Sequence, residues 1–124
     1  MIDFQNASLL KLKPTDNSDY AEILTPMLAD GEDIFYSFRG IRDAVVFTNK
    51  RIFAINIQGL TGKKKDFTSL PYKKIQAYSI ETSGMIDLDS ELELWFSSLG
   101  IVRLEFVSRT DVNAICRLIS QNVL

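Results

Sequence analysis

Hydrophobic residues near the start of the chain recur with the period of a helix. Asn17 or Ser18 can cap the start of this helix, and Asp30-Gly31 marks its end. Pro26 lies inside the pattern, where proline removes a hydrogen bond and clashes with the preceding turn. We therefore expect a kinked helix or two short helices. The apolar positions that define it are Tyr20, Ile23, Leu24, Met27 and Leu28.

From Glu32 onward the hydrophobic period changes to two, which is typical of strands. Inward Leu92 and Leu94, for example, alternate with outward Glu91 and Glu93. The pattern predicts seven short strands over residues 32–39, 43–48, 51–58, 66–72, 74–82, 90–96 and 101–107. Strands at this hairpin spacing indicate an antiparallel barrel or sandwich.

A helical period returns at the end of the chain. Thr110 can cap this helix, and Asp111 suits the positive end of its dipole. Its apolar face is formed by Val112, Ile115, Cys116, Ile119 and Val123. We expect the strands to curl into a partly open barrel, with this helix covering one mouth.

Four short motifs follow one another in the middle of the chain. They are T-x-x-R from Thr48 to Arg51, Q-G-x-x-G-K-K from Gln58 to Lys64, S-x-P-Y-x-x-I from Ser69 to Ile75, and D-x-D-x-E-L from Asp87 to Leu92. With these motifs the chain resembles the bacterial pleckstrin-homology-like domain family from about Gly31 to its C-terminus.

The resemblance implies a mainly β fold, a seven-stranded antiparallel, partly open barrel capped by a C-terminal helix. Residues 1–30 would then be an extra N-terminal helical segment, and residues 31–124 the pleckstrin-homology-like domain. Domains of this family look suited to ring-like homo-oligomers, so the resemblance also implies self-association.

Composition and charge describe an ordinary globular protein, with 124 residues, 46% hydrophobic and 24% charged. The net charge of −2 argues against nucleic acid as a partner, because such binding needs a strongly basic surface. Cys116 is the single cysteine, so no internal disulfide is expected. Without a signal peptide pattern or a long apolar run, we expect a cytoplasmic location.

The segment QGLTGKKK carries two glycines and three lysines, Lys63, Lys64 and Lys65. It is not a P-loop, because its glycine spacing is too short and no Ser or Thr follows the lysine. The favoured interpretation is a hairpin loop whose lysines keep a sheet edge soluble. The alternative is a contact with an anion or a lipid headgroup, to which Arg39 and Arg42 on the first hairpin would add charge.

The sequence has few residues in patterns that could form a metal site or a catalytic site. Asp87, Asp89, Glu91 and Glu93 alternate along one strand, but the glycine that an EF-hand needs is replaced by Leu92. The chain has no histidine, and Cys116 falls on an apolar helix face, as a structural thiol does. We predict no metal ligands, no cofactor and no enzymatic activity.

Two large aromatic residues, Phe35 and Trp95, alternate out of phase with inward neighbours and are predicted to point outward. Aromatic side chains on an outer face can mark a protein interface. Our leading hypothesis is a non-enzymatic binding or scaffold module that self-associates into a homo-oligomer. The alternatives are a peripheral binder of anionic membrane headgroups and a peptide-binding module at a sheet edge.

Overall fold

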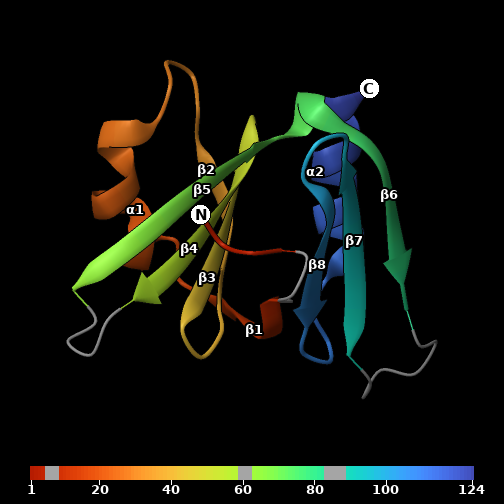
Figure 1. Cartoon of the computed structure of the whole chain (residues 1–124), viewed down its shortest axis with the longest axis horizontal. Coiled ribbons are helices and arrows are strands. Elements are labelled where there is room, and N and C mark those ends of the chain that lie inside the picture. Colours follow the sequence, from red (N-terminus) through yellow and green to blue (C-terminus); the bar gives the residue numbers. More distant parts are fainter. Residues whose placement is uncertain (5–8, 59–62, 83–88) are drawn as a thin grey trace.

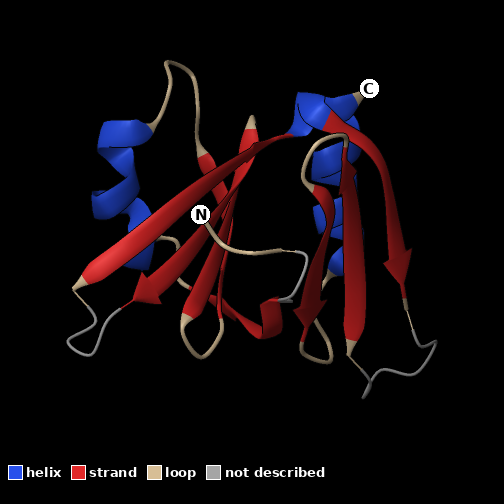
Figure 2. Cartoon of the chain, in the orientation of Figure 1, coloured by secondary structure: helices blue, strands red, loops and turns tan. Residues whose placement is uncertain are grey.

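The structure is a computed structural model that describes residues 1–4, 9–58, 63–82 and 89–124. Strands dominate it, as Figure 2 shows. The elements are β1 (Leu9–Thr15), α1 (Ser18–Leu24), a 3₁₀-helix (Thr25–Met27), β2 (Ile34–Arg39), β3 (Asp43–Thr48), β4 (Arg51–Gln58), β5 (Lys64–Pro71), a second 3₁₀-helix (Tyr72–Lys74), β6 (Ile75–Glu81), β7 (Ser90–Phe96), β8 (Gly100–Phe106) and α2 (Val112–Val123).

The strands form a single sheet in the order β5-β4-β3-β2-β1-β8-β7-β6. Neighbouring strands are antiparallel except β1 and β8, which are parallel. Strands β2–β5 form one half of the molecule and β6–β8 the other, with α2 behind β7 and β8 in Figure 1. The predicted fold class is confirmed: the protein is mainly β and partly open, with a C-terminal helix and a helix near its N-terminus.

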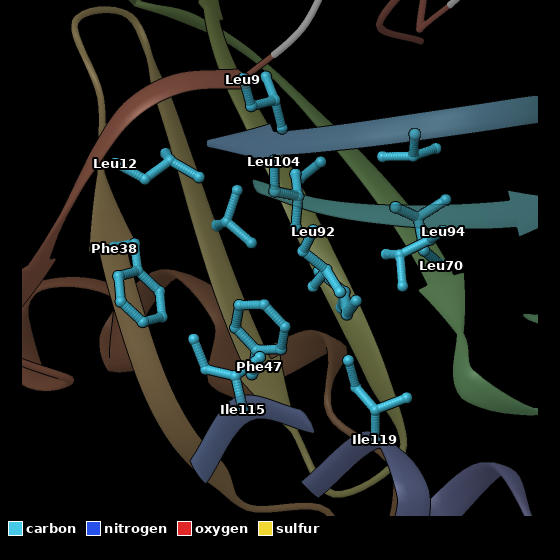
Figure 3. Close-up of a cluster of buried hydrophobic side chains, with 14 of the residues drawn as sticks. Leu9, Leu12, Phe38, Phe47, Leu70, Leu92, Leu94, Leu104, Ile115 and Ile119 are labelled. Carbon is cyan, nitrogen blue, oxygen red and sulfur yellow. The ribbon is translucent and has the colours of Figure 1, made fainter. Parts of the chain in front are cut away.

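The main core lies between the two halves of the sheet. Figure 3 shows Ile115 and Ile119 of α2 beside Phe47, with Leu92 and Leu104 from the other half above them. All five are at most 2% exposed, so the apolar face of α2 closes the core as the sequence predicted. Burial of this kind supplies most of the folding free energy.

Strand β1 was missed by the sequence prediction, which expected seven strands and a helical segment before residue 31; the sheet has eight strands. Simple alternation fails here because a bulge lies between Leu9 and Leu12, which are both buried. Lys11 within the bulge has φ 56°, a left-handed conformation that is rare outside glycine. The division into residues 1–30 and 31–124 stays a prediction, although β1 pairs with two strands of the second unit.

The predicted pair of short helices is present, because α1 passes directly into the 3₁₀-helix that contains Pro26. Asn17 is the N-cap residue of α1, one of the two expected, but its side chain makes no capping bond. The Ser18 amide donates instead to the Asp16 carboxylate at 2.9 Å. Leu24 is fully buried in a second, smaller core with Ala44, Val46, Phe53 and Ile55. Those four residues lie on the outer face of β3 and β4, so the helical segment covers that face.

A buried ion pair fastens this helical segment to the sheet. Both carboxylate oxygens of Glu32 accept hydrogen bonds from Arg51, at 2.9 Å each, and Oε2 also accepts one from Thr48 at 2.7 Å. Arg51 donates in addition to the carbonyl of Met27 at 2.7 Å. Burial by itself would raise the pKa of Glu32, but hydrogen bonds from Arg51, Thr48 and the Ala29 amide outweigh it and lower that pKa.

These contacts explain two motifs in the sequence. Thr48 and Arg51 are the ends of T-x-x-R, and the hydroxyl of Tyr72 from S-x-P-Y-x-x-I donates to the Thr48 carbonyl at 2.7 Å. These two motifs therefore have structural roles.

At the other end of the chain, Asp111 and not Thr110 caps α2, because its carboxylate accepts from the Ala114 amide. Thr110 instead donates to the carbonyl of Val107.

Candidate functional site

The two edges of the sheet are the first candidate surface. Strand β5 pairs only with β4, and β6 pairs only with β7, among the residues that the structure describes. Each edge therefore has a row of backbone groups without a partner strand, which can accept another strand. Lys64 and Lys65 begin β5 and are exposed, whereas Glu81 ends β6 and is exposed.

The outer face of β6, β7 and β8 is the second candidate surface. Trp95 is 46% exposed, as predicted, and is aligned across the strands with Ala77 and Ile101. These three side chains line a shallow hollow of about 200 Å³. The cross-strand row of Ala77, Trp95 and Ile101 forms the apolar end of this outer face.

Charged rows occupy the rest of this face. Glu93 accepts a hydrogen bond from Arg103 at 2.9 Å in the row beside Trp95. In the next row Glu91 stands between Glu81 and Glu105, so three carboxylates align across the strands. Like charges directly opposite each other are unfavourable. The face is therefore apolar at one end and acidic at the other.

Phe35 lies on β2, in the other half of the molecule, and is 45% exposed. Its outward position is as predicted. It lines a separate hollow of about 360 Å³ between β2 and the start of α2, together with Asn17 and Ala114. The structure therefore does not bring Phe35 and Trp95 into one patch.

The predicted basic residues of the first hairpin differ in their surroundings. Arg39 donates to the Tyr20 hydroxyl at 3.2 Å and to Asp19 at 3.3 Å, so it is held in one position. Arg42 is exposed and makes no ion pair with the described residues. Between them Ile41 is 93% exposed at the tip, a feature that the sequence prediction did not single out.

The predicted lysines lie at the start of β5, the second strand of the β4–β5 hairpin. Residues 59–62 of that hairpin lie outside the described residues. Lys63, Lys64 and Lys65 are all exposed. Lys65 lines one small cavity together with Arg39 and Ile41. The structure thus places the end of the lysine segment beside the first hairpin.

Two further lysines near this hairpin were missed by the sequence prediction because they belong to β1. Lys11 and Lys13 line a hollow of about 490 Å³ together with Arg39 and Ile41. Lys11 bonds to Asp89 at 2.8 Å, and this hydrogen bond raises the pKa of its ammonium group. Only the pairing of β1 with β2 brings these lysines to Arg39, so no local pattern could have indicated them.

Comparison with known proteins settles the family. The sequence pattern described as Bacterial PH domain matches residues 3–123, which is nearly the whole chain. The protein belongs to the bacterial PH domain family.

Solved structures and relatives agree with this assignment. A DUF1696-family protein with a pleckstrin-homology domain from Shewanella loihica PV-4 is 38% identical, with a TM-score of 0.80 over 92% of this chain and 98% of that one. A pleckstrin homology domain from Shewanella amazonensis SB2B is 38% identical, with a TM-score of 0.67 over 96% of this chain and 93% of that one.

Two relatives from Bacillus subtilis strain 168 are uncharacterised proteins. YozO is 33% identical over 83% of this chain and 89% of its own length. YjqA is 49% identical over 61% of each chain, so the match spans about three fifths of that relative. The relatives therefore support the family without naming a ligand.

PH domains are typically non-enzymatic binding modules, and this chain shares their fold. Burial raises the pKa of the half-buried Cys116 thiol, which makes it a poor nucleophile at neutral pH. In the described part of this PH domain, no three His, Cys, Asp or Glu side chains are placed to hold a metal ion together, and no helix is long and apolar enough to cross a membrane.

Proposed function

We propose that this bacterial PH domain is a scaffold module that self-associates through the two edges of its sheet. The observation that carries the proposal is that one sheet ends in two different edge strands, β5 and β6, neither of which pairs with a second strand in the described part of the chain. Pairing β6 of one copy with β5 of the next would extend the sheet from subunit to subunit. Such a head-to-tail contact makes a ring if the rotation between copies closes.

Charge favours one orientation of this contact. In an antiparallel arrangement, the start of β5 meets the end of the neighbouring β6. Lys64 and Lys65 would then approach Glu81 of the next copy, since these residues stand at those strand ends. Opposite charges across a strand pair are favourable, whereas the parallel arrangement would separate them.

Native mass spectrometry over a concentration series tests this proposal. We expect a closed oligomer that survives dilution. The charge-reversed variant Lys64→Glu/Lys65→Glu should shift the population toward monomer, and so should Glu81→Lys. Combining all three changes in one chain should restore the oligomer, because every contact regains opposite charges.

The double variant Lys73→Glu/Lys74→Glu is the matched control, since these exposed lysines lie on the 3₁₀-helix between β5 and β6. It should leave the oligomer intact. A monomer at every concentration would overturn self-association. An oligomer that is unaffected by all the charge reversals would overturn the edge contact. A strand-like peptide that co-purifies with the protein would show that an edge binds an extended ligand instead.

A second candidate function is peripheral binding to anionic membranes, which the position of Ile41 favours. This side chain is 93% exposed at the tip of the first hairpin, between Arg39 and Arg42. Lys63, Lys64 and Lys65 on the next hairpin arm are exposed as well. Each basic residue near an anionic surface contributes about 1 kcal/mol. Co-sedimentation with phosphatidylglycerol vesicles should therefore collapse with added salt and weaken in the Ile41→Ser variant.

A further inference from the structure

The outer face of β6–β8 is a sheet face without a second layer of structure within the described part of the chain. On the other half of the sheet, the segment that contains α1 covers the corresponding face and buries Leu24. Sheets normally bury an apolar face against another layer, because exposed apolar area costs free energy. Trp95 is 46% exposed, so the apolar end of the open face is a place where a further layer can be added.

The hollow beside Trp95 suits one side chain of a partner better than a separate ligand. Its volume is about 200 Å³, and Ala77 and Ile101 lie in the same cross-strand row as Trp95. Small-molecule sites usually begin at about 300 Å³ and enclose most of the ligand. Aromatic side chains with apolar neighbours are instead typical of the anchor points of protein interfaces.

The charge of this face favours a basic partner. Glu91 lies between Glu81 and Glu105 in the acidic row, and Lys11 reaches only the Glu105 end of that row, at 3.8 Å. Glu81 and Glu91 make no ion pair with the described residues. A Lys or Arg of a partner placed over this row would relieve the repulsion between its carboxylates.

The cross-strand rows fix the spacing that such a partner needs. Trp95 and Glu91 are four residues apart on β7, which corresponds to about 13 Å at about 3.3 Å per residue. The row between them is neutral, because Arg103 donates to Glu93 at 2.9 Å. A helix rises about 1.5 Å per residue and covers this distance in about eight residues. Positions i, i+4, i+7 and i+8 lie on one face of that helix.

A helix is also the element that can lie on this face with its backbone satisfied. The N–H and C=O groups of a sheet point toward neighbouring strands, so the face offers them to no second layer. An extended segment placed there would leave its own backbone groups unpaired, whereas a helix pairs them internally. The described helices of this chain do not fit, since α1 carries Asp19 and Glu22 and the apolar face of α2 is buried in the core.

We propose that the outer face of β6–β8 binds an amphipathic helix of another protein. One apolar side chain of that helix lies in the hollow beside Trp95, and a Lys or Arg about two turns away lies over the acidic row. The proposal goes beyond self-association, because both edges of the sheet stay free when this face is occupied.

Fluorescence titration tests the proposal at the site itself, because Trp95 is the single tryptophan of the chain. The first probe is a synthetic helix of about 15 residues without tryptophan, with one Leu and with Lys at the i+7 and i+8 positions from it. Two matched probes replace the Leu by Ser or both Lys by Glu. Only the first probe should shift the Trp95 emission to shorter wavelength in a saturable way, since only this probe removes the indole from water.

Variants of the acidic row check the contribution of charge. Glu91→Gln should weaken binding of the Lys probe by up to about fivefold, the value of one exposed ion pair. Glu91→Lys should weaken it further and strengthen binding of the Glu probe. Glu22→Gln removes an exposed glutamate of α1 and is the control that should change nothing. The edge variant Lys64→Glu/Lys65→Glu should bind the Lys probe as the wild-type protein does, so a failure of the proposed self-association leaves this test intact.

Two results would overturn the proposal on binding. These are the absence of a saturable change in Trp95 emission with any probe, and equal affinities for the Lys and Glu probes. Native mass spectrometry supplies a third test. If Trp95→Ser converts an oligomer into monomers, the face contacts a second copy of this chain and the proposal of a different partner is wrong.

Discussion

The outer faces of the two halves of the sheet differ in what covers them. On β3 and β4 the outer side chains Ala44, Val46, Phe53 and Ile55 are buried beneath α1 and the 3₁₀-helix. On β6–β8 no helix covers the outer face within the described residues, and Trp95 is 46% exposed there. Figure 1 shows α1 on the side of β2–β5, far from β6 and β7.

The hydrophobic pattern of each strand reflects whether its outer face is covered. β3 is apolar without interruption from Ala44 to Phe47, because both faces of the strand are buried. β7 and β8 alternate strictly, because one face meets the core and the other does not. A loss of alternation therefore marks the place where a second layer of structure is added.

The largest effect should come from the ion pair beneath the covered half. Arg51→Ala leaves the fully buried carboxylate of Glu32 without its partner, and we expect a loss of about 3–5 kcal/mol in the free energy of unfolding. Arg103→Ala is the matched control on the open face, where both side chains are more than a third exposed; it should cost at most about 1 kcal/mol. Urea unfolding measures both, and equal losses would contradict the comparison.

A smaller difference should separate one apolar side chain on each face. Leu24→Ala opens a cavity under the helical segment and should cost about 2–5 kcal/mol, since Leu24 is completely buried. Trp95→Ala should change the stability of the monomer by about 0.5 kcal/mol or less. Thermal unfolding at low protein concentration checks this pair. A Trp95→Ala loss as large as that of Leu24→Ala would show that the open face is part of a core.

Acid should weaken the ion pair beneath the covered half. The pKa of Glu32 is lowered in the folded protein, so its charged form stabilises the fold above the ordinary pKa of 4.5, and this contribution is lost as pH falls below that value. The stability difference between the wild-type protein and Glu32→Gln should therefore be constant near neutral pH and shrink as pH falls. Urea unfolding at a series of pH values between about 3 and about 7, a range that spans the ordinary carboxyl pKa, measures this stability difference. A difference that does not change with pH would contradict the role of the charge.

The smallest effect concerns the acidic row on the open face. Glu91→Gln removes the middle charge between Glu81 and Glu105 and should raise stability by about 0.2–1 kcal/mol. Added salt should reduce this gain. Glu22→Gln, an exposed glutamate on α1, is the control and should change little. A loss of stability in Glu91→Gln would contradict net repulsion along this row.

Much of the fold followed from local pattern. The predicted strands 43–48, 51–58 and 90–96 have the same bounds in the structure, and Phe35 and Trp95 point outward as their alternation indicated. β1 was not predicted from the sequence pattern, because its bulge breaks the alternation and its partner β8 lies at the far end of the chain. The basic hollow beside the first hairpin depends on that strand, since Arg39 was identified from the sequence but Lys11 and Lys13 were not.

The sequence by itself determined the mainly β class, the terminal helix and the family, because periodicity and short motifs act over a few residues. Only the tertiary structure decided that β1 completes the sheet, that T-x-x-R holds the helical segment through Glu32, and that Lys13 faces Arg39. These features join residues that are distant along the chain. Their free energy comes from pairing and burial that exist only once the sheet has formed.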